Sequence, residues 1–290
     1  MTVASPTQTL SRARGRDHIV DVLIAERAPK LAASPAWPLL RPLLYRFLDY
    51  AKARRMADAI AALPGRAGLE HVSRLLSVQV AAAGLEHVPR RGRLIVVCNH
   101  PTGIADGIAV YDALKSIRPD LCFYANSDAH RVAPGMADVL IPVEWVEAKR
   151  TRGRTRETLL LTRQALEADR CLIIFPSGRL ARRQADGRLS DPPWAPSAVS
   201  LARKYAAAIL PLHVAGPWSG LFHFFNRFSS ELRDVTLFHE LLNKQGRAFI
   251  LTAGRPVPPA MLEGEPSEAI AGLKAFVEAK LPGHPGRAFA

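Results

Sequence analysis

The sequence contains a histidine and an aspartate whose spacing suits proton transfer. His100 follows the apolar segment 93–98 and precedes Pro101, which disfavours a helical conformation at His100. Thr102 and Gly103 allow a tight loop, and Asp106 stands where the next helix should begin. An aspartate at this spacing can fold back onto the imidazole, fix its tautomer and stabilise its protonated form, as a general base requires. The spacing alone also fits a histidine in a turn and an aspartate that caps a helix.

A second polar turn follows another apolar segment. Phe175-Pro176-Ser177-Gly178-Arg179 comes directly after Cys171–Ile174. Gly178 permits a close approach of the backbone, and the arginines at 179, 182 and 183 are suitable bidentate donors to a phosphate or carboxylate. By itself, a Pro-Ser-Gly sequence indicates only a turn.

Both motifs stand at the ends of predicted strands. Short apolar runs predict strands at 77–82, 93–98, 121–125, 139–144, 171–175, 209–214 and 247–253. Helical stretches are expected at about 106–117, 154–169, 196–207, 235–244 and 266–281. This alternation predicts an α/β fold with a mixed, largely parallel sheet flanked by helices, in which ligands bind beyond the carboxyl ends of the strands.

The N-terminal part has a different character. Residues 1–16 are polar and basic, which predicts a mobile tail, residues 17–76 form an N-terminal helical segment, and residues 77–290 form the α/β domain. The segment from Trp37 to Ala53 has leucines at helical spacing and arginines among and after them. This pattern fits a helix on a membrane surface and also a helix packed on the main domain.

Composition narrows the classes of function. The formal net charge of +13 favours an anionic partner, namely nucleic acid, anionic lipid or an acidic carrier protein. No apolar run is long enough for a transmembrane helix. The three cysteines, Cys98, Cys122 and Cys171, each adjoin an apolar run, which favours buried, reduced thiols and a cytosolic compartment.

Several motifs are missing from the sequence. It has no G-x-S-x-G elbow, no nucleotide-binding glycine loop and no H-E-x-x-H, so a serine hydrolase of that type, a nucleotide cofactor and a metal site are not expected. Aromatic residues make up only 7% and no DNA- or RNA-binding motif stands out, so nucleic acid is an unlikely partner.

The two motifs resemble those of a known enzyme family. Asn99–Gly107 (NHPTGIADG) looks like the first motif of the glycerolipid, or lysophospholipid, acyltransferases, which include the 1-acyl-glycerol-3-phosphate acyltransferases. The family usually has four residues between the histidine and the aspartate. The five found here resemble the hemolysin-like and lyso-ornithine-lipid branch, as does the segment 237–244. FPSGR looks like the third motif, with Ser177 in place of the family's glutamate and Arg179 one place early.

Two further segments fit the same family. Ile141-Pro142-Val143 and the basic residues after it, Arg150 among them, stand where the second motif would be. The segment 209–214, with Pro211, resembles the fourth motif, a strand that lines the acyl site. His213 in this segment is expected to be a core histidine.

The resemblance implies roles for named residues. It makes His100 the catalytic base and Asp106 its partner, and it places these residues at the substrate: Asn99, Pro101, Gly103, Gly107, Arg150, Phe175, Pro176, Ser177, Gly178, Arg179 and Pro211. It also implies a fatty acyl group transferred from acyl carrier protein or coenzyme A to a hydroxyl of a lysolipid such as 1-acylglycerol-3-phosphate, with no cofactor besides that thioester. The alternative acceptor is lyso-ornithine lipid or another lysolipid without glycerol. The implied place of work is the cytoplasmic face of the inner membrane, peripherally bound to its anionic surface. A non-catalytic lipid- or nucleic-acid-binding protein is the alternative of a different class.

Overall fold

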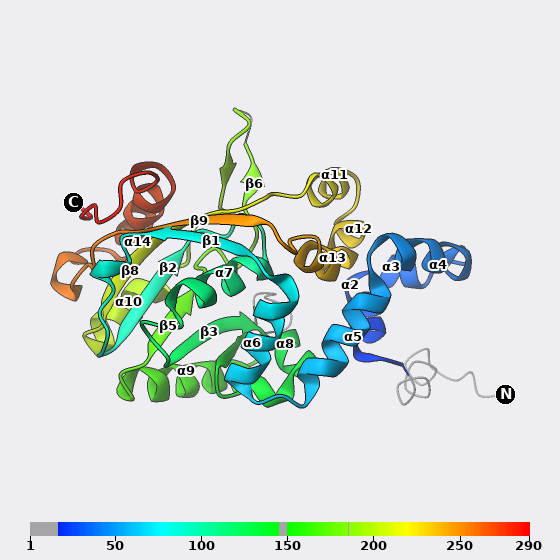
Figure 1. The fold of residues 1–290 in the computed structure, drawn as a ribbon, viewed down its shortest axis with the longest axis horizontal. Coiled ribbons are helices and arrows are strands. Elements are labelled where there is room, and N and C mark those ends of the chain that lie inside the picture. Colours follow the sequence, from blue (N-terminus) through cyan, green and yellow to red (C-terminus); the bar gives the residue numbers. More distant parts are fainter. Residues whose placement is uncertain (1–16, 145–149, 185) are drawn as a thin grey trace.

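A seven-stranded sheet forms the centre of the computed structural model, which describes residues 17–144, 150–184 and 186–290 (Figure 1). Its strand order is β1-β9-β8-β2-β5-β3-β4. All neighbouring strands are parallel except β8 and β9, which are antiparallel. The strands are β1 (Gln79–Ala83), β2 (Leu94–Cys98), β3 (Leu121–Asn126), β4 (Leu140–Val143), β5 (Cys171–Ile174), β8 (Ala208–Ala215) and β9 (Ala248–Ala253). Each of the seven predicted strands is present, and the predicted mixed, largely parallel sheet is confirmed.

The central strands β2 and β5 are buried on both faces. Along β2, Leu94, Val96 and Cys98 belong to one apolar cluster, whereas Ile95 and Val97 belong to another on the opposite face. This explains why both strands are uninterrupted apolar runs in the sequence. The three cysteines are buried free thiols, as predicted, and burial raises the pKa of Cys122 to about 11.

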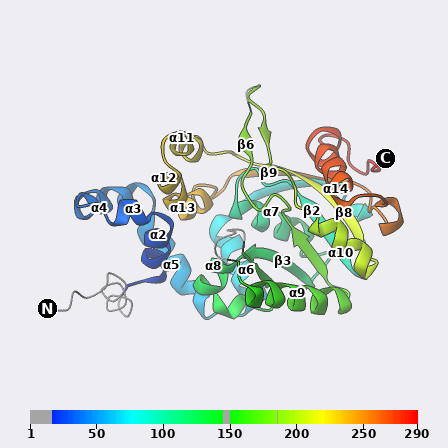
Figure 2. The ribbon, with the colours of Figure 1, turned by 180° about the vertical axis from the view of Figure 1, so that it is seen from behind.

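Helices cover the two faces of the sheet. One face packs against α6 (Gly65–Leu76) and α7 (Ile104–Leu114), and the other against α9 (Arg152–Glu167), α10 (Ser197–Tyr205) and α14 (Pro266–Ala275), which continues as a π-helical turn over Phe276–Lys280. The short α8 (Ser127–Val132) lies between β3 and β4. The elements that were not predicted include α8, the hairpin of β6 (Arg182–Arg183) and β7 (Leu189–Ser190), which projects from the body in Figures 1 and 2, and the helix α11 (Gly220–Phe228).

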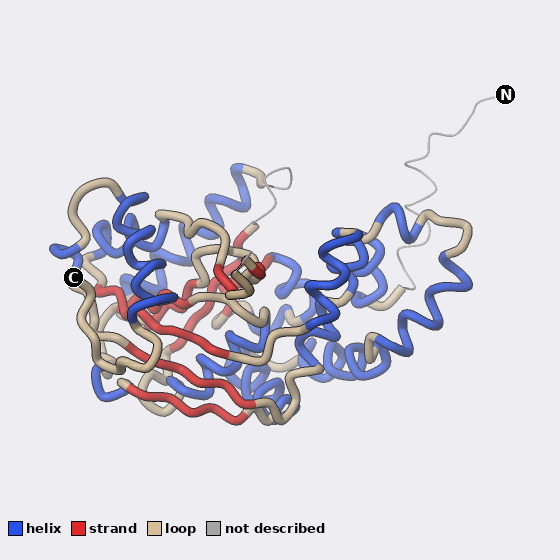
Figure 3. The backbone as a smooth tube through the Cα atoms, turned by 90° about the horizontal axis from the view of Figure 1, so that it is seen from above, coloured by secondary structure: helices blue, strands red, loops and turns tan. Residues whose placement is uncertain are grey.

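The N-terminal helices form one end of the molecule together with α11, α12 (Ser230–Val235) and α13 (Leu237–Leu242), as Figures 1 and 3 show. They are α2 (Ile19–Arg27), α3 (Pro29–Ala32), α4 (Trp37–Phe47) and α5 (Tyr50–Ala61). The residues that α5 and α6 bury belong to the same apolar cluster as β2. Among the described residues, no helix has the length and apolar character needed to cross a bilayer.

The prediction of one continuous helix from Trp37 to Ala53 is wrong. The helix breaks after Phe47, and Asp49 adopts a left-handed conformation with φ of 53°. The break brings the rings of Tyr45 and Tyr50 into a stack with centroids 3.8 Å apart, and both hydroxyls donate to Asp21 of α2. These contacts replace the helical continuity that the apolar spacing suggested.

Candidate active site

His100, in the loop after β2, meets Asp106, in the first turn of α7. The imidazole Nδ1 lies 2.9 Å from Oδ2 of Asp106, the contact that the sequence spacing predicted. The His100 side chain is half-buried, and its ring packs on that of Phe175 with centroids 4.4 Å apart. Because the Asp106 carboxylate accepts at Nδ1, it selects the tautomer in which Nε2 carries the lone pair. In the part of the chain that the structure describes, Nε2 makes no hydrogen bond.

Asp106 also caps the helix that it begins. Its carboxylate accepts from the amides of Thr102 and Gly103, at 2.9 and 3.0 Å, and from the Thr102 hydroxyl at 2.5 Å. The side chain is fully buried. The geometry is compatible with both interpretations of the spacing, since one carboxylate caps the first turn of α7 and contacts the His100 ring.

The Asn99 side chain has a structural role, and its predicted substrate contact stays a prediction. Its Nδ2 donates to the carbonyl of Val214, and its Oδ1 accepts from the amide of Val214. Both ends of this buried amide are thus bound to β8, as a strand backbone would be. The Asn99 side chain thus extends the pairing of β2 with β8 by one step and holds Asn99 in place directly before His100.

The FPSGR segment lies beside the histidine loop. Phe175 and Pro176 are buried, and Gly178 has φ of 60°. The Ser177 hydroxyl donates to the carbonyl of Arg179, so it closes its own turn, and the Arg179 side chain is exposed. The backbone of the segment that follows meets the catalytic loop directly, because the amide of Ala181 donates to the carbonyl of His100 at 2.8 Å.

The glycines of the first motif permit these close contacts. Gly103 has φ of 97°, and a Cβ there would lie 3.3 Å from Leu180. A Cβ on Gly107 would approach Phe175 to 4.0 Å, which is ordinary contact. Pro101, which follows His100 in the loop, is buried.

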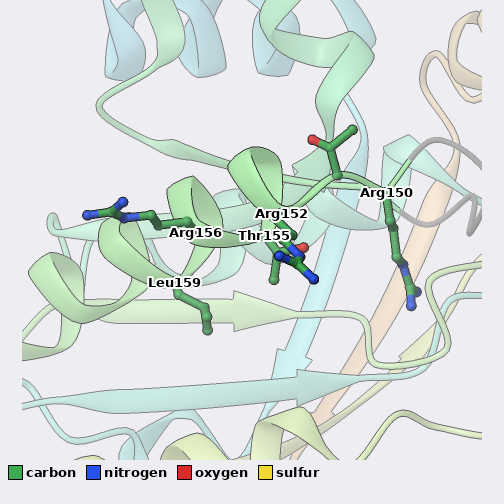
Figure 4. A pocket seen from close by; sticks show the side chains of 6 residues that line it. Arg150, Arg152, Thr155, Arg156 and Leu159 are labelled. Carbon is green, nitrogen blue, oxygen red and sulfur yellow. The ribbon is translucent and has the colours of Figure 1, made fainter.

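Two predicted substrate residues lie away from this cluster. Pro211 is buried in β8 opposite Val97, three residues before His100 in register, and packs against Gly254, so it is part of the sheet core. Arg150 follows β4, which lies three strands from β2, a separation of about 14 Å. Its Nε donates to the carbonyl of Glu144, and its side chain borders an open hollow with Arg152, Arg156 and Leu159 (Figure 4). A substrate role for Arg150 stays a prediction. The Nδ1–H of His213 donates to the carbonyl of Val277, and burial lowers the pKa of the imidazole, as befits a core histidine.

Sequence reasoning missed Asp191. Its carboxylate accepts the backbone amide of His100, at 3.1 and 3.2 Å, and the indole N–H of Trp194 at 2.9 Å. The Asp191 amide donates to Glu278, which is paired with Lys274. The only signal in the sequence is an aspartate followed by Pro-Pro-Trp in an otherwise polar loop.

Asp191 makes the stability of the protein depend on pH. Burial raises the pKa of its carboxyl from 3.8 to about 6, against the effects of Trp194 and of His100. Because the folded state holds this proton more tightly than the unfolded state, the stabilisation is present below about pH 4 and is lost as the pH rises to about 6. Between about pH 4 and pH 6, the free energy of unfolding of the wild type should fall by up to about 3 kcal/mol relative to that of Asp191→Asn. Urea unfolding at pH 4 to 7 measures the effect. The exposed control Glu263→Gln should show no such change, and an equal change in it would contradict the assignment.

The comparisons with known proteins agree with this site. Residues 79–215 match the family model described as Acyltransferase. Two curated relatives are both named lyso-glycine lipid O-acyltransferase. The one from Phocaeicola vulgatus is 28% identical over 196 residues, 66% of this chain and 68% of the relative, and the one from Bacteroides thetaiotaomicron is 24% identical over 66% and 70%. Residues 79–215 therefore form an acyltransferase-family domain, and the chain is similar to lysolipid O-acyltransferases.

This acyltransferase also has a distant structural relative. The crystal structure of the 1-acyl-sn-glycerophosphate acyltransferase PlsC from Thermotoga maritima matches it with a TM-score of 0.47 and 15% identity, over 83% of this chain and 93% of that one. The family match spans the strands that carry both motifs, from β1 to the end of β8. The matched domain of this O-acyltransferase contains His100, Asp106 and the FPSGR turn.

Proposed function

We propose that this enzyme transfers a fatty acyl group from an acyl thioester to a hydroxyl group of a lysolipid. The observation that carries the proposal is the His100–Asp106 pair, which leaves Nε2 as a base at the carboxyl end of β2. The thioester of acyl carrier protein or of coenzyme A is the donor, and the reaction needs no further cofactor.

The proposed reaction uses one base and no acyl-enzyme. Nε2 of His100 accepts the proton of the acceptor hydroxyl as its oxygen attacks the thioester carbonyl. The imidazolium is stabilised by the buried Asp106 carboxylate at Nδ1. When the tetrahedral intermediate collapses, the carbon–sulfur bond breaks and the leaving thiolate takes the proton from His100. The products are the acylated lipid and the free thiol.

Among the lysolipid acceptors, we propose one whose head group is an amino acid. The two curated relatives are named for a lyso-glycine lipid, which is such an acceptor. The third motif favours the same class, since Ser177 stands in place of the glutamate usual in the family, and its hydroxyl donates to the Arg179 carbonyl. 1-Acylglycerol-3-phosphate is the second candidate and belongs in the same assay.

The lipid substrate implies work at a bilayer, and we propose peripheral binding to the anionic cytoplasmic face of the inner membrane. Helix α4 buries no residue completely and exposes Leu39, Leu40, Leu43 and Phe47, with Arg41 and Arg46 among them. Apolar residues with a basic rim are typical of helices that lie in the lipid interface. The net charge of +13 has the sign that such a surface attracts.

The test is acceptor-dependent release of thiol from acyl carrier protein and coenzyme A thioesters. Vesicles would present lyso-glycine lipid, lyso-ornithine lipid or 1-acylglycerol-3-phosphate. We expect release with a lysolipid that carries an amino acid, and at least about tenfold less with the phosphate acceptor, which corresponds to the loss of one charged contact. Preference for the phosphate acceptor would reverse the order of the candidates. No release with any pair, from folded protein, would favour a non-catalytic lipid- or nucleic-acid-binding protein.

A further inference from the structure

Helix α11 exposes two large aromatic side chains. Phe224 and Phe228 are 57% and 68% exposed, although they stand one turn apart on the same face with ring centroids at 5.0 Å. The helix begins at Ser219, whose hydroxyl accepts from the amide of Phe222, and Leu221, Phe222 and Phe225 are partly buried beneath it. The outward face therefore contributes nothing to the core, and a soluble protein gains no stability from it.

The exposed face of α11 is fixed relative to α4. Helix α12 follows α11 directly, and its Glu231 carboxylate accepts the amides of Lys30 and Leu31 in α3, at 3.2 and 2.8 Å. Helix α12 also packs on α2. Figures 1 and 2, which view the molecule from opposite sides, show α11 and α12 beside the helices that lead into α4. The aromatic residues of α11 and the leucines of α4 thus belong to helices at the same end of the molecule.

The same region is connected to the catalytic loop. Strand β8, whose Val214 is bound by Asn99, leads through Trp218 into α11. The guanidinium of Arg183, on the hairpin strand β6, lies 5.7 Å from the centre of the Trp218 ring. That hairpin begins next to Ala181, whose amide donates to His100. Both segments beside the exposed face are therefore anchored to the histidine loop.

The charges in this region fit an anionic lipid surface. Neither α4 nor α11 contains an aspartate or a glutamate, whereas they contain Arg41, Arg46 and Arg227, and Arg183 lies at Trp218. Exposed aromatic and aliphatic side chains with arginines, and without acids, are the composition of a helix that enters the head-group region of an anionic bilayer.

We propose that α11 is a second bilayer-contacting helix, which binds anionic lipid through Phe224 and Phe228 and, together with α4, turns the His100 edge of the sheet toward the membrane. The inference rests on the proposed function, because it gives the lysolipid a route from the bilayer to the catalytic loop. It is also independently measurable, because membrane binding requires no turnover.

The experiment compares three double variants by co-sedimentation with vesicles of phosphatidylglycerol and of phosphatidylcholine. Phe224→Ser/Phe228→Ser removes the proposed contact, and Phe224→Leu/Phe228→Leu preserves its apolar character. Leu159→Ser/Leu160→Ser is the matched control, because these side chains on α9 are exposed to similar extents, 56% and 51%. We expect the α11 serine variant to bind phosphatidylglycerol vesicles at least about tenfold more weakly, from the loss of two buried apolar side chains, and the other two to bind as the wild type does.

Activity adds a second readout. With a short-chain lysolipid acceptor below its critical micelle concentration, the α11 serine variant should retain wild-type turnover, while its turnover of vesicle-bound acceptor falls with its binding. Unchanged vesicle binding, or an equal loss in the α9 control, would overturn the proposal. If sedimentation velocity shows that the wild type is an oligomer and the serine variant a monomer, the proposal is also overturned, because α11 is then a protein interface. If the wild type binds vesicles through α11 and transfers no acyl group, the proposed function fails and the membrane contact stands.

Discussion

Replacing His100 with alanine is expected to lower the rate of acyl transfer by about 10²- to 10⁴-fold, the usual contribution of a positioned general base. The reason is geometric. Nε2 is the ring atom that the Asp106 contact leaves as an acceptor of the hydroxyl proton. The rate of thiol release in the presence of a lysolipid measures the effect, with KM values for donor and acceptor close to those of the wild type.

The His100→Ala variant should fold normally. The side chain is half-buried, and the two backbone hydrogen bonds of His100, to Asp191 and Ala181, do not depend on it. Thermal unfolding within a few degrees of the wild type is the control for folding. Full transfer activity in a folded His100→Ala protein would remove the basis of the mechanism.

Replacing Asp106 with asparagine is expected to have a comparable effect on rate by a different route. An asparagine amide that donates to Nδ1 stabilises the tautomer with the proton on Nε2, which cannot accept a proton from the acceptor, and it also removes the charge that stabilises the imidazolium. We expect a fall in kcat of about 10²- to 10⁴-fold.

Asp106→Asn should also destabilise the protein, unlike His100→Ala. The asparagine keeps only one oxygen to accept from the Thr102 and Gly103 amides and the Thr102 hydroxyl. At least one buried donor then loses its acceptor, which should lower the free energy of unfolding by about 1–3 kcal/mol. Urea unfolding and steady-state kinetics on the same preparation measure the two effects. Asp112→Asn, on the same helix α7, is the control for a carboxylate of α7 outside the loop. A variant of Asp106 that loses stability and keeps its kcat would reduce this residue to a helix cap.

The strands and the largely parallel character of the sheet could be predicted from local patterns because the strands are short apolar runs separated by turns. β2 and β5 are buried on both faces, so their side chains could not be polar on either side. The His100–Asp106 contact was also predictable because it is local. The two residues are only six positions apart. Pro101 restricts that loop further, and Gly103 permits its left-handed turn.

The contacts that could not be predicted join segments that are distant in the sequence. Asp191 lies 91 residues from His100, and no periodicity relates the two. Asn99 looks like a substrate ligand in the motif, yet it is bound to Val214, 115 residues away. The break at Asp49 also escaped prediction, because the stacking of Tyr45 and Tyr50 over Asp21 outweighs the local preference for a continuous helix. Tertiary contacts decide such positions, and one sequence does not display them.

The double engagement of Asp106 has a consequence for how tolerance to mutation would be interpreted in this protein. A survey that scores abundance in cells would find Asp106 intolerant, because its loss uncaps α7, and would find His100 permissive. A survey that scores lipid product would find both positions intolerant. The abundance survey alone would therefore classify Asp106 as a purely structural residue. Comparison of the two surveys would identify His100 as a position that is needed for lipid product and not for the fold.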